Sequence, residues 1–246
     1  MPRPMLALLA LLALPLAAAA CGGSKHAAPA TADPLGTVKA AFEKTFAAGS
    51  ESVDLKANAQ SSGQSLVVSG GGAVDTRKNS GTLKLHVDAG PLATSLDEIV
   101  IGQVAYLKSP LLAGQLPNGK TWIKLDGRAF AKLAGLPGSV LAQNPSATLK
   151  YLQQLKSARE IGTESAGTRY RATLDRSALP AAARSLSSYD VWVGDDGFIH
   201  RVRVAAAAVH ATVTVDLSNF GKAVSASAPP PDEVYAAKGA IPGFGG

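Results

Sequence analysis

The stretch that decides the fold lies near the end of the chain, where residues 209–218 read VHATVTVDLS. Apolar Val213 and Val215 alternate here with polar Thr212 and Thr214, and the alternation runs through the whole stretch without a break. A period of two is typical of a β-strand that has one apolar and one polar face. A strand of this kind must bury its apolar face against another part of the fold.

The same alternation recurs throughout the chain. Strand patterns occupy residues 53–59, 66–74, 83–87, 99–101, 104–107, 122–125, 170–174, 189–193 and 199–204. The sequence GDDG at residues 194–197 predicts a hairpin turn between the last two of these strands. A glycine triplet at residues 70–72 predicts a bulge or a sharp bend inside its strand. Many antiparallel strands with one apolar face are therefore expected.

Helical spacing is confined to three segments. Leu35, Val38 and Phe42 recur at helical spacing after Pro34, and Gly49 is placed to end that helix. Residues 128–133 and 146–155 have helical spacing in the middle of the chain. These helices are the available cover for the apolar face of the sheet, so the fold class is predicted to be α+β.

The N-terminus predicts export and lipidation. Residues 1–20 combine Arg3 with a Leu/Ala-rich stretch of signal-peptide length, which predicts a signal peptide. The small residues Ala18, Ala19 and Ala20 stand directly before Cys21, the only cysteine in the chain, and the pattern is similar to a bacterial lipobox. We expect Cys21 to be the lipidation site and first residue of a mature protein anchored on the extracytoplasmic side of the cell membrane. The alternative is an ordinary signal peptide with an incidental cysteine nearby.

Composition sets the remaining boundaries. Residues 21–34 are predicted to form a lipidated flexible tether, residues 35–233 a lipid-binding domain, and residues 234–246 a flexible tail. The formal net charge of +6, part of which leaves with Arg3, suits a neighbouring anionic lipid surface. It is too small and too dispersed to indicate nucleic-acid binding, which needs a basic stripe with stacking aromatics.

No pattern in the sequence indicates catalysis. The four histidines have no metal-ligand spacing, and no cofactor fingerprint or nucleophile elbow occurs, so we expect no enzyme, no metal and no cofactor. The neighbouring carboxylates Asp97 and Glu98 are interpreted as solvent-exposed. Arginines alternate on two strands, and either form a cluster for anionic headgroups or lie on a solvated outer face: Arg169, Arg171, Arg201 and Arg203.

The order of these segments resembles that of a known family. Lipobox, tether, helix, strands, a helical insertion and closing hairpins follow one another as in the actinobacterial LppX_LprAFG lipoprotein family, whose fold resembles the LolA/LolB carriers. The best local match is residues 215–224, VDLSNFGKAV, followed by prolines at 229–231. The resemblance implies a strongly curved antiparallel half-barrel sheet with helices over its concave apolar face. It also implies transport of lipids or glycolipids across the periplasm, without catalytic residues.

The leading hypothesis is therefore a membrane-anchored lipoprotein that binds a lipid or glycolipid in an apolar cavity. The cavity candidates are apolar strand residues and an apolar segment of the helical insertion: Leu55, Leu83, Leu85, Val87, Ile101, Leu136, Val140, Leu141, Val191, Val193, Val202, Val204, Val213 and Val215. An ordinary solid core would show the same alternation. The alternative hypothesis is a structural or regulatory lipoprotein that binds a protein partner and no lipid. A component of the export machinery is a further candidate partner.

Overall fold

The computed structural model of the chain describes residues 33–61, 64–126, 154–175, 177, 188–206 and 210–237. These residues belong to one compact unit, Asp33–Gly246. Within them, twelve strands form one sheet in the order β12-β6-β5-β4-β3-β2-β1-β11-β10-β9-β8-β7. The predicted signal peptide and tether, with Cys21, lie outside the described residues.

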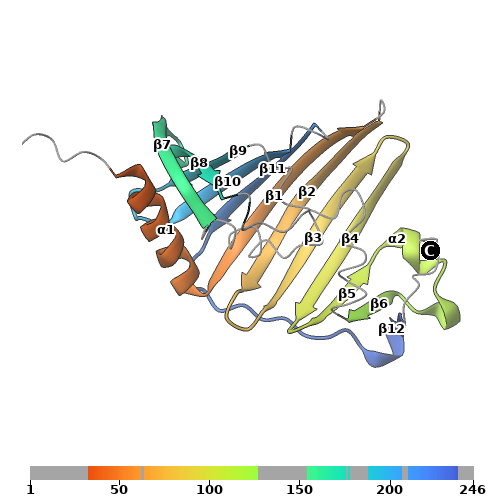
Figure 1. Cartoon of the computed structure of the whole chain (residues 1–246). Coiled ribbons are helices and arrows are strands. Elements are labelled where there is room, and N and C mark those ends of the chain that lie inside the picture. Colours follow the sequence, from red (N-terminus) through yellow and green to blue (C-terminus); the bar gives the residue numbers. More distant parts are fainter. Residues whose placement is uncertain are drawn as a thin grey trace, which may run out of the picture. The chain divides into compact units, whose positions relative to one another are not determined.

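The sheet is built from two meanders (Figure 1). The first contains β1 (Ser50–Ser61), β2 (Gln64–Asp75), β3 (Ser80–Ala89), β4 (Leu92–Ile101), β5 (Val104–Lys108) and β6 (Trp122–Asp126). The second contains β7 (Leu155–Glu164), β8 (Gly167–Leu174), β9 (Ser188–Val193), β10 (Ile199–Ala206) and β11 (Ala211–Ser218). Antiparallel pairing of β1 with β11 joins the two meanders.

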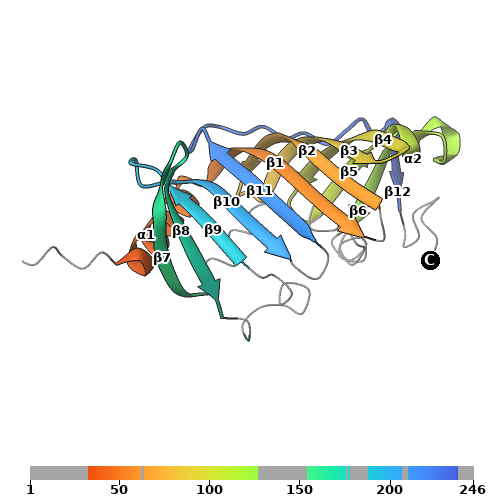
Figure 2. The same cartoon turned by 90° about the horizontal axis from the view of Figure 1, so that it is seen from above.

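The sheet is open and curved, as Figure 2 shows. Its two edge strands are β7 and β12 (Val234–Ala236), and β12 pairs with β6 in parallel. The predicted α+β class with a strongly curved, mostly antiparallel half-barrel sheet is therefore confirmed. Strand β7 was not predicted, because most of its residues are exposed and its sequence shows no apolar period of two.

Helix α1 (Pro34–Ala48) forms as its sequence predicts. The Asp33 carboxylate accepts a hydrogen bond from the Gly36 amide at 2.9 Å, and Gly49 ends the helix in the left-handed conformation with a φ of 75°. Val38 and Phe42 are buried in the same apolar cluster as the strands. The helix contacts β7, β8, β9 and β10, so it covers that end of the sheet. Residues 128–133, and 146–153 of the third predicted helix, lie outside the described residues; Leu155 begins β7.

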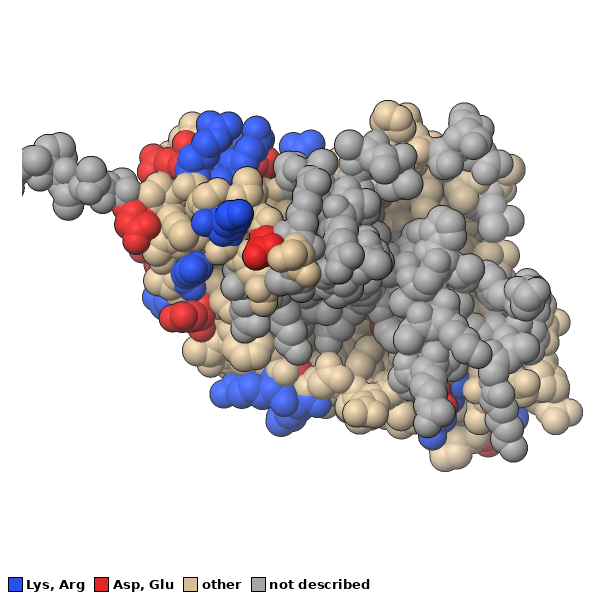
Figure 3. Space-filling model, viewed as in Figure 1, with Lys and Arg blue, Asp and Glu red and all other residues tan. Residues whose placement is uncertain are grey.

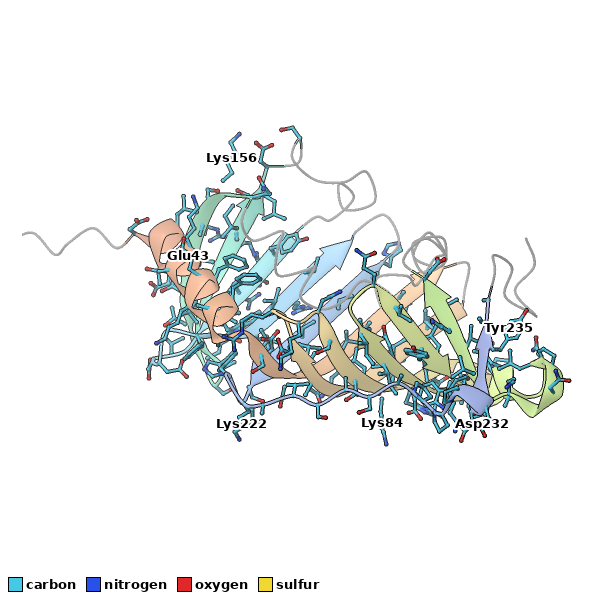
Figure 4. All side chains as sticks on the ribbon, turned by 90° about the horizontal axis from the view of Figure 1, so that it is seen from below. Glu43, Lys84, Lys156, Lys222, Asp232 and Tyr235 are labelled. Carbon is cyan, nitrogen blue, oxygen red and sulfur yellow. The ribbon has the colours of Figure 1, made fainter. Side chains whose placement is uncertain are left out.

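The predicted flexible tail is wrong at its beginning. After β11, residues 222–230 have no regular structure, and a 3-10 turn at Pro231–Glu233 leads into β12. The Thr121 amide donates to the Glu233 carbonyl at 3.0 Å and fixes the start of this pairing. Figure 4 marks Lys222 and Asp232 near the two ends of this connection, which runs past the ends of the strands. Residues 234–236 belong to the sheet because Val234 and Tyr235 pair with Trp122 and Ile123.

The glycine triplet contains no bulge, contrary to the first expectation. Gly70, Gly71 and Gly72 pair in continuous register with both β1 and β3. A Cβ atom at Gly72 would lie 1.8 Å from the Thr82 carbonyl oxygen, and one at Gly71 would lie 2.4 Å from that of Val53. The triplet is therefore needed because the backbones of three neighbouring strands approach closely at this point.

Gly72→Ala is expected to destabilise the protein by about 3 kcal/mol, because the added methyl group meets backbone that cannot move aside. Urea unfolding of the two proteins measures the difference. Gly114→Ala is the matched control, since its Cβ would meet nothing within 4 Å and its φ is −74°. Equal stability of the Gly72 and Gly114 variants would contradict the close approach of the strands.

Candidate functional site

One face of the sheet is apolar over most of its width. Along one row of register partners, Leu85, Leu55, Val215, Val202, Val191 and Tyr170 all lie on this face and are buried. We call it the apolar face, and the opposite side the polar face. The row is connected because each residue lies beside an apolar residue of a neighbouring strand, except at Gly70, which stands between Leu55 and Leu85.

The expected phase of the strands is confirmed. Leu85 and Val215 are 4% and 5% exposed, whereas Lys84 is exposed and Thr214 is half-buried on the polar face. Figure 4 shows Lys84 projecting away from the sheet. Because a one-residue shift would exchange the two faces, this agreement fixes the side on which an apolar ligand would lie.

Most of the candidate cavity residues lie together on the apolar face. These are Leu55, Leu83, Leu85, Val87, Val191, Val193, Val202, Val204, Val213 and Val215. Leu136, Val140 and Leu141 lie outside the described residues. Ile101 is a correction: Leu96 pairs with Leu85 on the apolar face, so strand alternation places Ile101 on the polar face.

The described apolar residues form two clusters. The larger one spans β1–β3, β7–β11 and α1, it includes Leu83 and Leu85, and the partly buried Leu96 of β4 packs against it. The smaller one contains Leu112 of α2 (Pro110–Ala113), Leu116, Ile123 and Leu125, with Leu107 packed against it. The two clusters meet across β4.

Glu98 of β4 lies at the boundary between these clusters. It pairs with Leu83 of the larger cluster on one side and with Leu107 of the smaller cluster on the other. Its side chain is only 5% exposed, and burial raises its pKa to about 7. The sequence interpretation of Glu98 as solvent-exposed is therefore wrong. The missed signal is its spacing of two from Leu96, which assigns both residues to one face.

Glu98→Gln is expected to stabilise the protein at high pH. A carboxyl with a raised folded-state pKa contributes full stability below its unfolded value of 4.5, and stability falls as the pH rises towards 7. Glutamine carries no such penalty, so the variant should exceed the wild type by on the order of 3 kcal/mol at about pH 8 and match it at about pH 4. Urea unfolding at both pH values measures this, and parallel pH curves would contradict it.

A second buried carboxyl lies at the other end of the same face. Glu51 of β1 is 2% exposed, and burial together with the charge of Asp75 raises its pKa to about 7. Its Oε1 atom has no hydrogen-bond partner among the described residues. In the strand order β4-β3-β2-β1, Glu51 is three strands away from Glu98, so the two carboxyls do not form a pair.

The polar face carries a different arrangement around Trp192 of β9. The guanidinium groups of Arg169 and Arg201 lie 5.0 and 5.8 Å from the centre of the Trp192 ring. The indole nitrogen donates to a Glu164 carboxylate oxygen at 2.9 Å. The aromatic ring is thus covered by arginines that are themselves held in place, which leaves it 3% exposed.

Carboxylates neutralise most of the predicted arginine cluster. Asp190 accepts hydrogen bonds from Arg169 at 2.6 Å and from Arg171 at 2.8 Å. Burial alone would raise the pKa of Asp190, but these hydrogen bonds outweigh it and hold the pKa below its usual value. Arg201 is paired with Asp216. Because Asp190 and Asp216 pair with three of the four arginines, the arginines do not form one bare cationic patch.

Arg203 is the exception on this face. It is exposed, and no described residue forms an ion pair or hydrogen bond with it. It lines an open depression of about 410 Å³ together with Asn58, Thr212 and Thr214. The depression is polar and lies on the side of the sheet away from the apolar clusters. The charges elsewhere are mixed: Figure 3 shows acidic and basic side chains interspersed over α1 and the neighbouring strand β7.

The described residues contain neither a membrane-spanning helix nor a cluster of metal ligands. None of their helices is long and apolar enough to cross a membrane. No group of three or more His, Cys, Asp or Glu side chains among them is arranged to hold a metal ion. The described geometry thus offers an apolar face with one carboxyl between two clusters, and it presents no cluster of metal ligands.

Comparison with known proteins identifies the fold. No protein-family model matches this sequence, and no curated protein matches it. The crystal structure of the Mycobacterium tuberculosis lipoprotein LppX matches with a TM-score of 0.51 and 14% identity, over 78% of this chain and 97% of LppX. LprF from Mycobacterium bovis matches with a TM-score of 0.49 and 12% identity, over 80% of this chain and 96% of LprF. The chain has the LppX fold, as the resemblance implied.

Proposed function

From the fold shared with the lipoprotein LppX, we propose that this protein is a lipoprotein that binds a lipid or glycolipid against its apolar face. It is held on the extracytoplasmic side of the cell membrane by lipidation at Cys21, and it carries or presents the lipid at the cell envelope. It acts by binding, and performs no chemical reaction on its ligand.

The observation that carries this proposal is the width of the apolar face. Buried aliphatic side chains follow one another from β3 to β9 across the sheet, in a band that runs over both meanders. An extended acyl chain laid along such a band would gain about 0.8 kcal/mol for each methylene group removed from water. Binding of this kind needs area and shape, and it needs few polar contacts.

The N-terminal sequence supports a function beside a membrane. A diacyl anchor at Cys21 attaches a protein stably, because two acyl chains hold where a single chain is marginal. An anchored protein with an apolar face is well placed to accept lipid from the bilayer to which it is tethered. The excess of lysine and arginine favours the same location, next to anionic headgroups.

The proposal is tested with the unacylated protein, which we define as residues 21–246 with Cys21→Ser. A fluorescent probe with a long acyl chain is titrated into this protein, and native mass spectrometry with lipid extraction identifies any ligand that co-purifies. We expect saturable binding of one or a few probe molecules, and a co-purified amphiphile. A protein that binds no probe and carries no lipid would contradict the proposal and favour the role of binding a protein partner.

A further inference from the structure

Glu98 is a buried carboxyl among aliphatic side chains on the apolar face. Its neighbours on the apolar face are Leu83 and Leu107 across the strands, and Leu96 and Val100 along β4. A buried carboxyl among aliphatic side chains costs free energy unless a partner satisfies it. The position lies between the two clusters, so any ligand that lay along the apolar face from one cluster to the other would pass directly over it.

The described residues supply Glu98 with no partner. None of them forms a hydrogen bond or an ion pair with it. The nearby hydroxyls of Thr94 and Ser109 bond to each other at 3.0 Å. Helix α2, which packs against β4, carries no titratable side chain.

Other titratable groups on the apolar face lie well away from Glu98. Glu51 on β1 and Tyr235 on β12 are each three strands away, and Tyr170 and Tyr189 are on strands β8 and β9, beyond β1. The charged residues of the adjoining strands, Lys84 and Asp88 on β3 and Lys108 on β5, belong to the polar face. No titratable group of the described strands thus competes with a ligand for the Glu98 carboxyl.

We propose that Glu98 binds the polar part of the lipid, and that it selects lipids with a neutral, hydroxyl-bearing polar part over lipids that carry a carboxylate. The inference rests on the proposed function, and it names the ligand class: an acyl ester of a polyol such as glycerol or a sugar. A hydroxyl group can donate to the carboxyl and accept from it, whereas a carboxylate on the ligand meets a like charge once Glu98 is ionised.

The pH dependence of binding separates these two ligand types. Because burial raises the pKa of Glu98 to about 7, the carboxyl is mostly neutral at about pH 6 and mostly ionised at about pH 8.5. A fatty acid should therefore bind less well at the higher pH. A monoacylglycerol with the same chain has no charge to repel, so its affinity should change little.

The experiment compares oleic acid with monoolein as competitors of the fluorescent acyl probe on the unacylated protein. For the wild type, the ratio of the oleic acid Kd to the monoolein Kd should rise by about tenfold between about pH 6 and about pH 8.5, as expected for one like-charge contact at short range. Glu98→Gln should remove this rise while it keeps monoolein binding, because the amide can still donate and accept. Asp97→Asn removes the adjacent carboxyl on the polar face and should behave as the wild type.

The outcomes separate this inference from the proposed function. A wild-type Kd ratio that is independent of pH, or a pH dependence that is as large in Glu98→Gln as in the wild type, overturns the role of Glu98 and leaves lipid binding in place. A wild type that binds neither competitor overturns both. Ionisation of oleic acid itself is common to all the proteins, so the difference between the wild type and the Glu98 variant decides the matter. Glu98→Ala takes the place of Glu98→Gln if the glutamine variant fails to fold.

Discussion

Val213→Trp is expected to abolish binding of a long-chain acyl probe while the protein keeps its fold. Val213 lies in the middle of the apolar face, paired with Ala57 and Val204, and is 9% exposed. An indole at this position would occupy the space over the sheet that we assign to the ligand. Titration with the probe and thermal unfolding are measured on both the variant and the wild type.

The matched control for this substitution is the next residue. Thr214→Trp places the same indole on the polar face, where it should leave probe binding unchanged. If the space over Val213 were a solid core, the tryptophan would instead be an overpacking substitution and would cost about 1–3 kcal/mol of stability. A large fall in melting temperature with Val213→Trp, in a protein whose wild type binds no probe, would therefore exclude the lipid-binding role.

Cys21→Ala is expected to release the protein from the membrane fraction or to leave its signal peptide uncleaved. The thiol of Cys21 is the only one in the chain, so the substitution removes every site for a thioether-linked anchor. Membrane fractionation, with metabolic labelling by a palmitate analogue, measures the loss. A cleaved Cys21→Ala protein that stays with the membrane would contradict the anchor. Ala20→Ser keeps a small residue before the cysteine and should be processed normally.

The sequence predicted the centre of the sheet better than its edges. In β11 and β3 every second residue is apolar, so the period identifies both the strand and its buried face. At the edges, most residues of β7 are exposed and β12 is three residues long, so neither has an apolar period to detect. The Pro-rich connection after β11 leads into β12 and places it beside β6. This pairing joins segments that are far apart in the sequence.

The candidate site was predicted in part for a related reason. Val191 and Val215 were found by their alternation, but Ile99, Val100 and Ile101 are three apolar residues in a row, and no period tells which of them faces the core. The spacing of two places Glu98 on the face of Leu96, and the register of β4 on β3, which pairs Leu96 with Leu85, shows that this is the apolar face and that Ile101 lies on the other. Glu98 is a charged residue on a face where apolar residues are expected, so the alternation of apolar and polar residues does not predict its burial.

The junction of the two meanders also bears on the order in which the protein folds. Within each meander, consecutive strands meet through contacts close in sequence, whereas Leu55 meets Val215 only when the ends of the long intervening chain are brought together. Pairings of this kind pay a larger loop-closure entropy and form slowly. Because the chain is synthesised from its N-terminus, the edge of β1 that pairs with β11 stays unpaired until β11 has been made. Pulse-labelling hydrogen exchange during refolding should therefore find the amides at the β1–β11 seam protected last, and an unfinished chain exposes at that seam an edge on which other strands can add.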